Sequence, residues 1–411
     1  MLRTAQQSHW RYLEDDGVSA HAGLAADEYL MRAYHGRRND RSPTLRLYTY
    51  RSHCALVGRF QNLAAEVDLE ACRRLDVQVG RRPTGGGAIL MGARQLGLCL
   101  VASAALVKHI ARPLDLYRYL AEPVVRALDG LGIRARFRPK NDLEVNHRKI
   151  AGLGVYFDPH GAMLFHTSLL VDLDVELMLQ VLRVPREKLA DKSGVHAVSE
   201  RITTVVRETG QPIEVDEVRR RVRQSFAEQF GAHFTSQPWE PVEQAEIVTL
   251  AREKYASPAW LHQRSPLSDM VGSGVHKTPA GLLRTYIGLK GDVIKSVLIT
   301  GDFFEGSDLL NRIEADLKWS ALERPRIQRV VERAFAHHGR QFFGLSAADV
   351  VTAIWKAGTN ARAQSRLTSK GSCYYPVRSV VEIRKSEIEI RNSETPIPDS
   401  GIENRNVQVA T

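Results

Sequence analysis

The residues best suited to chemistry form one short run, in which two arginines stand directly before three consecutive glycines. The run is Arg81-Arg82-Pro83-Thr84-Gly85-Gly86-Gly87, and apolar residues follow from Ala88. Glycine loses more backbone entropy on folding than any other residue, so a triplet is typical of a loop whose N–H groups approach a ligand. Arginine beside such a loop supplies charged donors for phosphate or carboxylate. The run therefore predicts an anion-binding loop, although a plain turn between two strands would contain similar glycines.

Lys149 is the second candidate for chemistry. It stands between two strand-like segments and is followed by Ile150, Ala151 and Gly152. From the residues alone, two interpretations are open: an inward lysine that reaches bound anions, or a solvated lysine in a hairpin turn beside His147.

The elements that must position these residues alternate between strands and helices. Apolar residues at helical or alternating spacing predict them. Helices are predicted at 24–34, 66–75, 113–132 (which contains Pro123), 174–183 and 214–229. Strands are predicted at 45–50, 54–58, 77–81, from 88 onward, and at 142–145, 150–157 and 162–171. This order predicts an α+β fold with a mixed, mostly antiparallel sheet.

A second, smaller α+β domain is predicted after the proline-punctuated segment 237–241. We expect helices at 242–255, 306–319, 324–338 and 346–357, with strands at 282–289 and 293–300 around a turn. The predicted division is 1–237, 242–358 and a polar tail, 359–411. The tail is predicted to be largely disordered, with only 377–391 alternating like a strand.

Composition narrows the function classes. The 411 residues include 57 Lys and Arg against 47 Asp and Glu, a net charge of +10. The positive residues are dispersed and show no nucleic-acid-binding signature, so we expect anionic substrates or a small acidic protein partner instead. The four cysteines are widely spaced, which predicts neither disulfides nor a zinc site. No apolar run suits a membrane helix or signal peptide, which predicts a cytoplasmic protein.

Six ordered motifs resemble those of the lipoate-protein ligases, within the biotin/lipoate ligase and octanoyltransferase superfamily. They are Gly58-Arg59-Phe60-Gln61-Asn62, Glu66-Val67, 81–88, Asn141-Asp142-Leu143, 148–152 and His166-Thr167-Ser168-Leu169-Leu170. The similarity covers about residues 20–210. The segment Lys254-Tyr255-Ala256-Ser257-Pro258-Ala259-Trp260 looks like the entrance to that family's C-terminal accessory domain.

The resemblance implies a two-step reaction. Lipoate and ATP, with Mg²⁺, give lipoyl-AMP and pyrophosphate, and a lysine of a lipoyl acceptor domain then displaces AMP. It implies a catalytic Lys149 that contacts nucleotide and lipoate. The other implied nucleotide contacts are Arg82, Gly87, Ala88, Ile89 and Leu90. The implied lipoate contacts are Gly85, Gly86, Gly152, Leu153 and Gly154. Asn141 and Asp142 are implied to lie near the metal and the phosphates. Arg81 is either structural or functional, and His166 either bonds backbone or faces the acyl site. The first helix and the loop after the glycines are expected to line an apolar tunnel.

The sequence departs from the family pattern after the glycines. Typical ligases have His-Asp-x-Gly-Asn there, whereas this chain has Met91-Gly92-Ala93-Arg94-Gln95, which is closer to the octanoyltransferase branch. That branch needs a thiolate nucleophile shortly after the segment matching Val181–Pro185, and no cysteine lies between Cys99 and Cys373. Cys99 lies in an apolar run and is predicted to be buried and inert. The ligase is therefore favoured over the octanoyltransferase, a non-catalytic binding module and a biotin ligase.

The changed loop and the basic charge suggest a specialised acceptor. We expect a single lipoyl-carrying protein resembling the glycine-cleavage H protein. The sequence leaves open the preference for lipoate or octanoate.

Overall fold

The computed structural model describes residues 8–34, 42–139, 141–183, 200–303, 307–338 and 344–373. Contacts between residues divide the chain into two compact units, residues 1–361 and 362–411. Among the described residues, no helix has the length and apolar character needed to cross a membrane.

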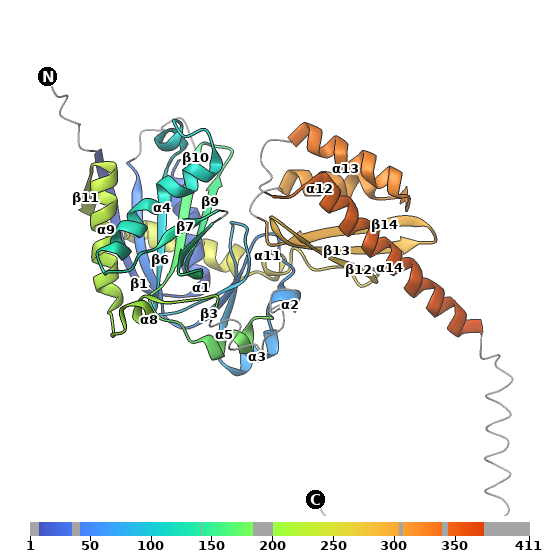
Figure 1. Ribbon diagram of the computed structural model, residues 1–411, viewed down its shortest axis with the longest axis horizontal. Coiled ribbons are helices and arrows are strands. Elements are labelled where there is room, and N and C mark those ends of the chain that lie inside the picture. The colour runs from blue at the N-terminus through green and yellow to red at the C-terminus, as the bar shows by residue number, and fades with distance from the viewer. Residues whose placement is uncertain are drawn as a thin grey trace, which may run out of the picture. The chain divides into compact units, whose positions relative to one another are not determined.

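An eight-stranded sheet forms the centre of the N-terminal part (Figure 1). Strand β1 pairs in parallel with both of its neighbours, β11 and β2, and the remaining neighbours are antiparallel. The prediction of a mixed, mostly antiparallel sheet is confirmed. In spatial order the strands are β11 (Ala232–Ser236), β1 (Ser8–Val18), β2 (Thr44–Tyr50), β6 (Gln95–Ser103), β10 (Ala162–Leu170), β9 (Arg148–Phe157), β8 (Asp142–Val145) and β7 (Arg136–Arg138).

Alternating side chains give this sheet two different faces, because successive residues of a strand point to opposite sides. On β2, Leu45 and Leu47 join the core beneath α4 (Pro113–Asp129) and α9 (Val215–Phe230). Tyr48 and Tyr50 instead join the core around α1 (Ala20–Arg32). The two tyrosines therefore lie on the α1 side of the sheet.

A three-stranded sheet carries the glycine loop. Strand β3 (Cys54–Val57) lies between β4 (Gln78–Arg81), which is parallel to it, and β5 (Ile89–Met91), which is antiparallel. The loop joins the two outer strands. Four short helices complete this region and its surroundings: α2 (Leu63–Glu66), α3 (Leu69–Arg74), α5 (Val175–Val181) and α8 (Val205–Thr209).

The C-terminal sheet domain has its own hydrophobic core. Its four strands are β12 (Gly272–Thr278), β13 (Gly281–Lys290), β14 (Val293–Gly301) and β15 (Ser320–Ala321). Its helices are α12 (Ser307–Leu317), α13 (Arg324–His338) and α14 (Ala347–Cys373). Between the two sheets the chain forms α10 (Pro241–Leu250), a π-helical turn (Ala251–Tyr255) and α11 (Pro258–Leu261).

Several elements differ from the sequence-based expectations. The helix predicted over 66–75 is two helices, because Asp68 caps α3 and Val67 adopts extended backbone that bridges to Leu182. Strand β1 was not predicted, since its charged residues obscure the alternation. Strand β12 was also missed. Helix α14 continues past the predicted end at 357 to Cys373, so residues 359–373 of the expected tail are helical. The strand-like segment 377–391 lies outside the described residues.

Candidate functional site

The glycine loop approaches the neighbouring backbone closely. A β-carbon at Gly58 would lie 2.1 Å from the carbonyl oxygen of Gly86, and Gly86 itself has a φ of 90°, which favours glycine. Gln61 accepts from the N–H of Gly58 with its side-chain oxygen, at 2.9 Å. The predicted loop therefore folds against residues 58–61, the first of the sequence motifs.

Arg82 lies beneath this loop and holds its shape. Its guanidinium donates to the carbonyl oxygens of Leu56 at 2.6 Å, Gly87 at 2.7 Å and Gly85 at 3.3 Å. Burial lowers the pKa of Arg82 to about 10, which leaves it charged at neutral pH. Since these three acceptors are neutral carbonyls, the loop surrounds a buried positive charge that favours a nearby anion.

Arg81 points to a different set of backbone groups. It donates to the carbonyl oxygens of Gly58, Arg59 and Gln61 at 2.7–3.0 Å, and to that of Leu261 at 2.7 Å and 3.1 Å. The indole of Trp260 donates in return to the Arg81 carbonyl at 2.9 Å. These contacts support the structural interpretation of Arg81, which joins the glycine loop to the segment containing α11.

Lys149 forms an ion pair with Asp142, at 2.8 Å between Nζ and Oδ1. The second carboxylate oxygen of Asp142 binds Arg138 at 2.7 Å. Burial opposes ionisation of Asp142, but Lys149 and Arg138 outweigh it and hold the pKa of this carboxyl below its usual value. Strand pairing places Gly152 opposite Asp142, and a β-carbon at Gly152 would lie 3.0 Å from Lys149 Nζ. Glycine at 152 therefore leaves room for the lysine.

One cavity brings most of the predicted site residues together. It is lined by residues of the glycine loop, by Asn141 just before β8, and by residues of β5, β9 and β10. The predicted residues among its lining are Arg82, Gly85, Gly86, Gly87, Ile89, Asn141, Lys149, Gly152 and Leu153. Residues separated by about 70 positions in the sequence thus share a single cavity.

Four predicted residues do not line it. Leu90 is buried in the core beneath β3, and Ala88 packs against the same core. Asp142 forms an ion pair with Lys149, and the Lys149 side chain lines the cavity. Gly154 lies opposite His166, where a β-carbon would be 2.1 Å from the imidazole Nε2.

His166 lines the cavity and is partly buried. Its Nε2 lies 3.0 Å from Thr84 Oγ1 in the glycine loop. Burial, with the charge of Arg82, lowers the pKa of His166 to about 3. The imidazole is therefore neutral at physiological pH and does not add a second positive charge.

Sequence reasoning did not identify part of the lining. These residues are Tyr48, Tyr50, Leu56, Thr167 and Ser168. Leu24 and Met91 also line the cavity, and they come from the first helix and from the segment after the glycines, which were expected to supply an apolar lining. The two tyrosines carried a signal, because they alternate with Thr49 in a predicted strand. Which face of that strand borders a cavity is decided only by the packing of α1.

The three cysteines whose side chains are described are all buried. Burial and the neighbouring Asp27 carboxyl raise the pKa of Cys99 well above its usual value. Burial likewise raises the pKa values of Cys54 and Cys72. A thiol nucleophile needs the opposite shift, so the prediction of an inert Cys99 agrees with its surroundings.

Asn141 and Asp142 were expected near magnesium. The Asn141 amide donates to the Leu153 carbonyl at 3.1 Å. Both oxygens of Asp142 are engaged by cationic side chains, Lys149 and Arg138. Carboxylate oxygens are ligands for hard divalent cations, and a magnesium site at these two residues stays a prediction. In the structure the geometry suits a carboxylate that orients Lys149.

Two kinds of relatives resemble the chain in sequence. "Octanoyltransferase LipM" of Kyrpidia tusciae is 30% identical over 282 residues, which cover 62% of this chain and 99% of the relative. "Lipoate-protein ligase LplJ" of Bacillus subtilis is 25% identical over 327 residues, which cover 78% of this chain and 92% of the relative.

Solved structures show the same fold. A bipartite lipoate protein ligase of Thermoplasma acidophilum, studied with its E2 lipoyl domain, matches with a TM-score of 0.55 at 27% identity and covers 64% of this chain and 99% of its own. A lipoate-protein ligase A bound with ATP matches with a TM-score of 0.52 at 26% identity and covers 62% of this chain and 98% of its own. Residues 19–227, just over half of the chain, match the family described as the lipoyl protein ligase A/B catalytic domain. The chain belongs to this family of lipoate ligases and octanoyltransferases.

Proposed function

We propose that this protein is an ATP-dependent lipoate-protein ligase. It would activate lipoate or octanoate as the acyl-AMP and transfer the acyl group to a lysine of a lipoyl acceptor domain. The observation that carries the proposal is the composition of the cavity: a glycine loop over the buried charge of Arg82 faces the Lys149 amine. No cysteine is among the lining residues in the part of the chain that the structure describes.

The first step joins two anions. A carboxylate oxygen of the acid attacks the α-phosphorus of ATP, and the bond to pyrophosphate breaks. Lys149 and the loop N–H groups would stabilise the charge that gathers at phosphorus. We assign to Asp142 the positioning of Lys149, and magnesium would enter bound to the triphosphate.

In the second step the acceptor amine attacks the acyl carbon. An amide bond forms, AMP leaves, and the amine loses a proton to solvent or to AMP. Adenylation makes this possible because AMP is a far better leaving group than hydroxide. The ATP-bound relative supports the use of ATP, and the relative studied with its E2 lipoyl domain supports a lipoyl acceptor. We place the reaction in the cytoplasm.

Octanoyl transfer from acyl carrier protein is the second candidate, because LipM matches along nearly its full length. That match leaves over a third of this chain uncovered, whereas LplJ covers more of it. The transfer also needs a reactive thiol. The three cysteines whose side chains are described are buried, and residues 184–199, beside the segment where that branch has its cysteine, contain none in the sequence.

The deciding experiment is the intact mass of acceptor domains after incubation with the protein. The panel holds an H-protein-like carrier and dehydrogenase lipoyl domains. One arm supplies lipoate, ATP and Mg²⁺, and the other supplies octanoyl carrier protein without ATP. A lipoyl-sized gain only in the first arm is expected. A gain only in the second arm would show a transferase, and no gain with any acceptor would contradict both functions.

A matched pair of variants sharpens the test. Lys149→Ala is expected to abolish most of the mass gain. Lys290→Ala removes the same charge from the exposed end of β13 and should leave the gain unchanged.

A further inference from the structure

Strand β7 forms one edge of the eight-stranded sheet, and its surroundings are unusually basic. Residues 130–139 contain three arginines and no acidic residue. Ala135 is buried and Phe137 packs against the main core, whereas Arg134 and Arg136 are exposed. The alternation of the strand thus presents the arginines on one side and anchors the strand with the other.

Register connects this edge to Lys149. Arg138 lies opposite Asp142, and Arg136 lies opposite Glu144. A chain of ion pairs runs from Lys149 to Asp142 at 2.8 Å, on to Arg138 at 2.7 Å, and from Arg138 to Glu144 at 2.9 Å. The basic edge therefore lies on the same face of the sheet as the lysine of the candidate site.

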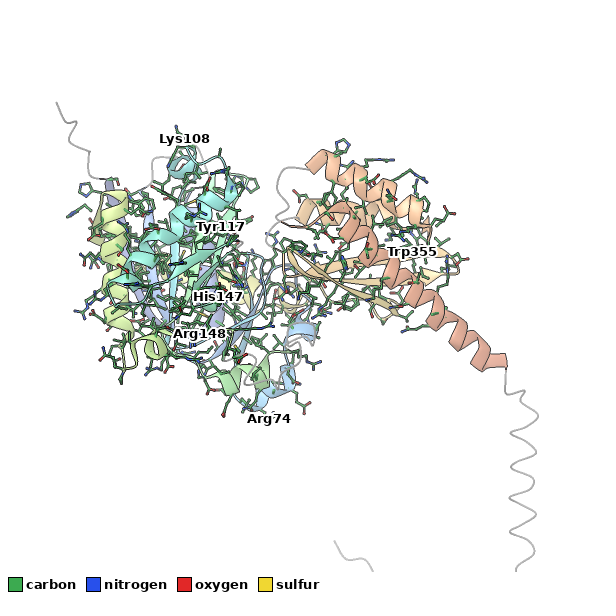
Figure 2. The ribbon with its side chains drawn as sticks, in the orientation of Figure 1. Arg74, Lys108, Tyr117, His147, Arg148 and Trp355 are labelled. Carbon is green, nitrogen blue, oxygen red and sulfur yellow. The ribbon has the colours of Figure 1, made fainter. Side chains whose placement is uncertain are left out.

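The edge is hollowed as well as charged. A groove of about 480 Å³ is lined by Arg134, Arg136, Arg138, Phe137 and Pro139, and by Asn146 and His147 of the turn between β8 and β9. Glu144 also lines it, and its carboxylate pairs with Arg138. Figure 2 labels His147 and its neighbour Arg148 at this turn. Among the described residues, neither Arg134 nor Arg136 forms an ion pair, so both charges are available to a partner.

We propose that this groove, defined by Arg134, Arg136, Arg138 and His147, docks an acidic face of the acceptor protein. The inference rests on the proposed function and adds the surface that recognises the acceptor. The acceptor lysine must reach an acyl group held beside Lys149, so its docking surface must border that residue. An acidic surface beside the acceptor lysine complements the unpaired arginines and places the amine at the cavity.

Helix α9, another arginine-rich segment of the protein, is less suited to this task. On α9, Arg220 and Arg221 both pair with Glu217, and Arg219 pairs with three carboxylates. Their charges are largely neutralised within the helix surface. The β7 edge combines unpaired positive charge with a connection to Lys149.

The test reverses charge in the groove and measures the two half-reactions separately. The docking variant is Arg134→Glu with Arg136→Glu. The matched control is Arg326→Glu with Arg329→Glu, which makes the same change of net charge on exposed positions of α13. Acyl-AMP formation, acyl transfer and acceptor binding by calorimetry without nucleotide are measured for each protein.

We expect the docking variant to form acyl-AMP at the normal rate and to lose about tenfold or more in kcat/KM for the acceptor, chiefly through KM. Acceptor binding should weaken in parallel, and the control should match the unaltered protein. An acceptor whose acidic residues near the lysine are changed to lysine should bind the docking variant better than the original acceptor does.

Two results would overturn the docking proposal: equal acceptor binding by docking variant and control, or loss of acyl-AMP formation in the docking variant alone. The first would place recognition elsewhere, and the second would assign the groove to the nucleotide. Absence of acyl-AMP from the unaltered protein would contradict the proposed function instead, while calorimetry still tests the groove.

Discussion

At the scale of single residues, the site contains two positive charges that are held differently. The Lys149 amine lies at the end of a flexible side chain and is oriented by Asp142. Arg82 is buried and tied to three carbonyls. Lysine is suited to follow charge that moves between carboxylate and phosphate, whereas a planar guanidinium is suited to hold a loop.

Lys149→Ala should slow acyl-AMP formation by roughly 10²-fold or more, because a charge aimed at the developing phosphorane is lost. The fold should persist, since Asp142 keeps its ion pair with Arg138. Pyrophosphate release measures the rate, and thermal unfolding checks the fold. An unchanged rate would remove Lys149 from the chemistry.

His166 should make stability depend on pH. Its folded pKa of about 3 lies below the usual value near 6.5, so between these values the unfolded chain binds a proton that the folded protein does not. The contribution to stability is complete above about pH 6.5 and is lost as the pH falls toward 3. The free energy of unfolding should fall by up to about 1.4 kcal/mol per pH unit in that window.

Chemical denaturation from pH 7 to pH 4, compared with a His166→Asn variant, measures this contribution. In the variant, the free energy of unfolding should lack the part of its pH dependence that comes from protonation of His166. Equal slopes for the two proteins would show that the imidazole is protonated in the folded state.

At the scale of elements, the glycine loop depends on close backbone contact at one glycine and on openness at another. A β-carbon at Gly58 would meet the Gly86 carbonyl at 2.1 Å, whereas one at Gly87 would find nothing nearer than 4.0 Å. The first contact is with rigid backbone, so the loop itself must move. The second position faces the cavity.

Gly58→Ala should therefore destabilise the protein by about 1–3 kcal/mol. Gly87→Ala should change stability by less than about 0.5 kcal/mol, yet weaken ATP binding about tenfold or more if the nucleotide lies against this backbone. Denaturation and nucleotide titration of the pair give both quantities. A Gly87→Ala variant with normal ATP affinity would place the nucleotide elsewhere.

At the scale of the whole molecule, the net charge of +10 should make acceptor recognition sensitive to salt. Charges on exposed surfaces are screened beyond about 8 Å at physiological ionic strength. We expect kcat/KM for the acceptor to fall about tenfold between low and high salt. The docking variant should show a weaker dependence, and equal dependences would argue against the β7 edge.

The division into domains 1–237 and 242–358 remains a proposal. Contacts group residues 1–361 as one unit, within which Arg81 donates to the Leu261 carbonyl and accepts from the Trp260 indole. The segment around α11 therefore supports the glycine loop directly. A role for the C-terminal sheet domain in excluding water from the adenylate follows from the same proposal.

The sequence by itself determined the elements that carry chemistry, because their signals are local. Glycine spacing, the run from Arg81 to Ala88 and the strands around Lys149 were all visible without coordinates. Alternation also predicted β2 and β10 as strands, and helical spacing predicted α4 and α9. Local signals failed where a helix cap set the end of an element. Asp68 caps α3 and so divides the helix predicted over 66–75.

Only the tertiary structure decided which side chains meet. The sequence does not state that Tyr48 and Tyr50 line the cavity, that Asp142 holds Lys149, or that Arg138 continues this chain to the β7 edge. These contacts depend on strand register and on which face α1 covers, and both are set by the packing of residues far apart in the chain. A one-residue change of register would move every such side chain to the opposite face.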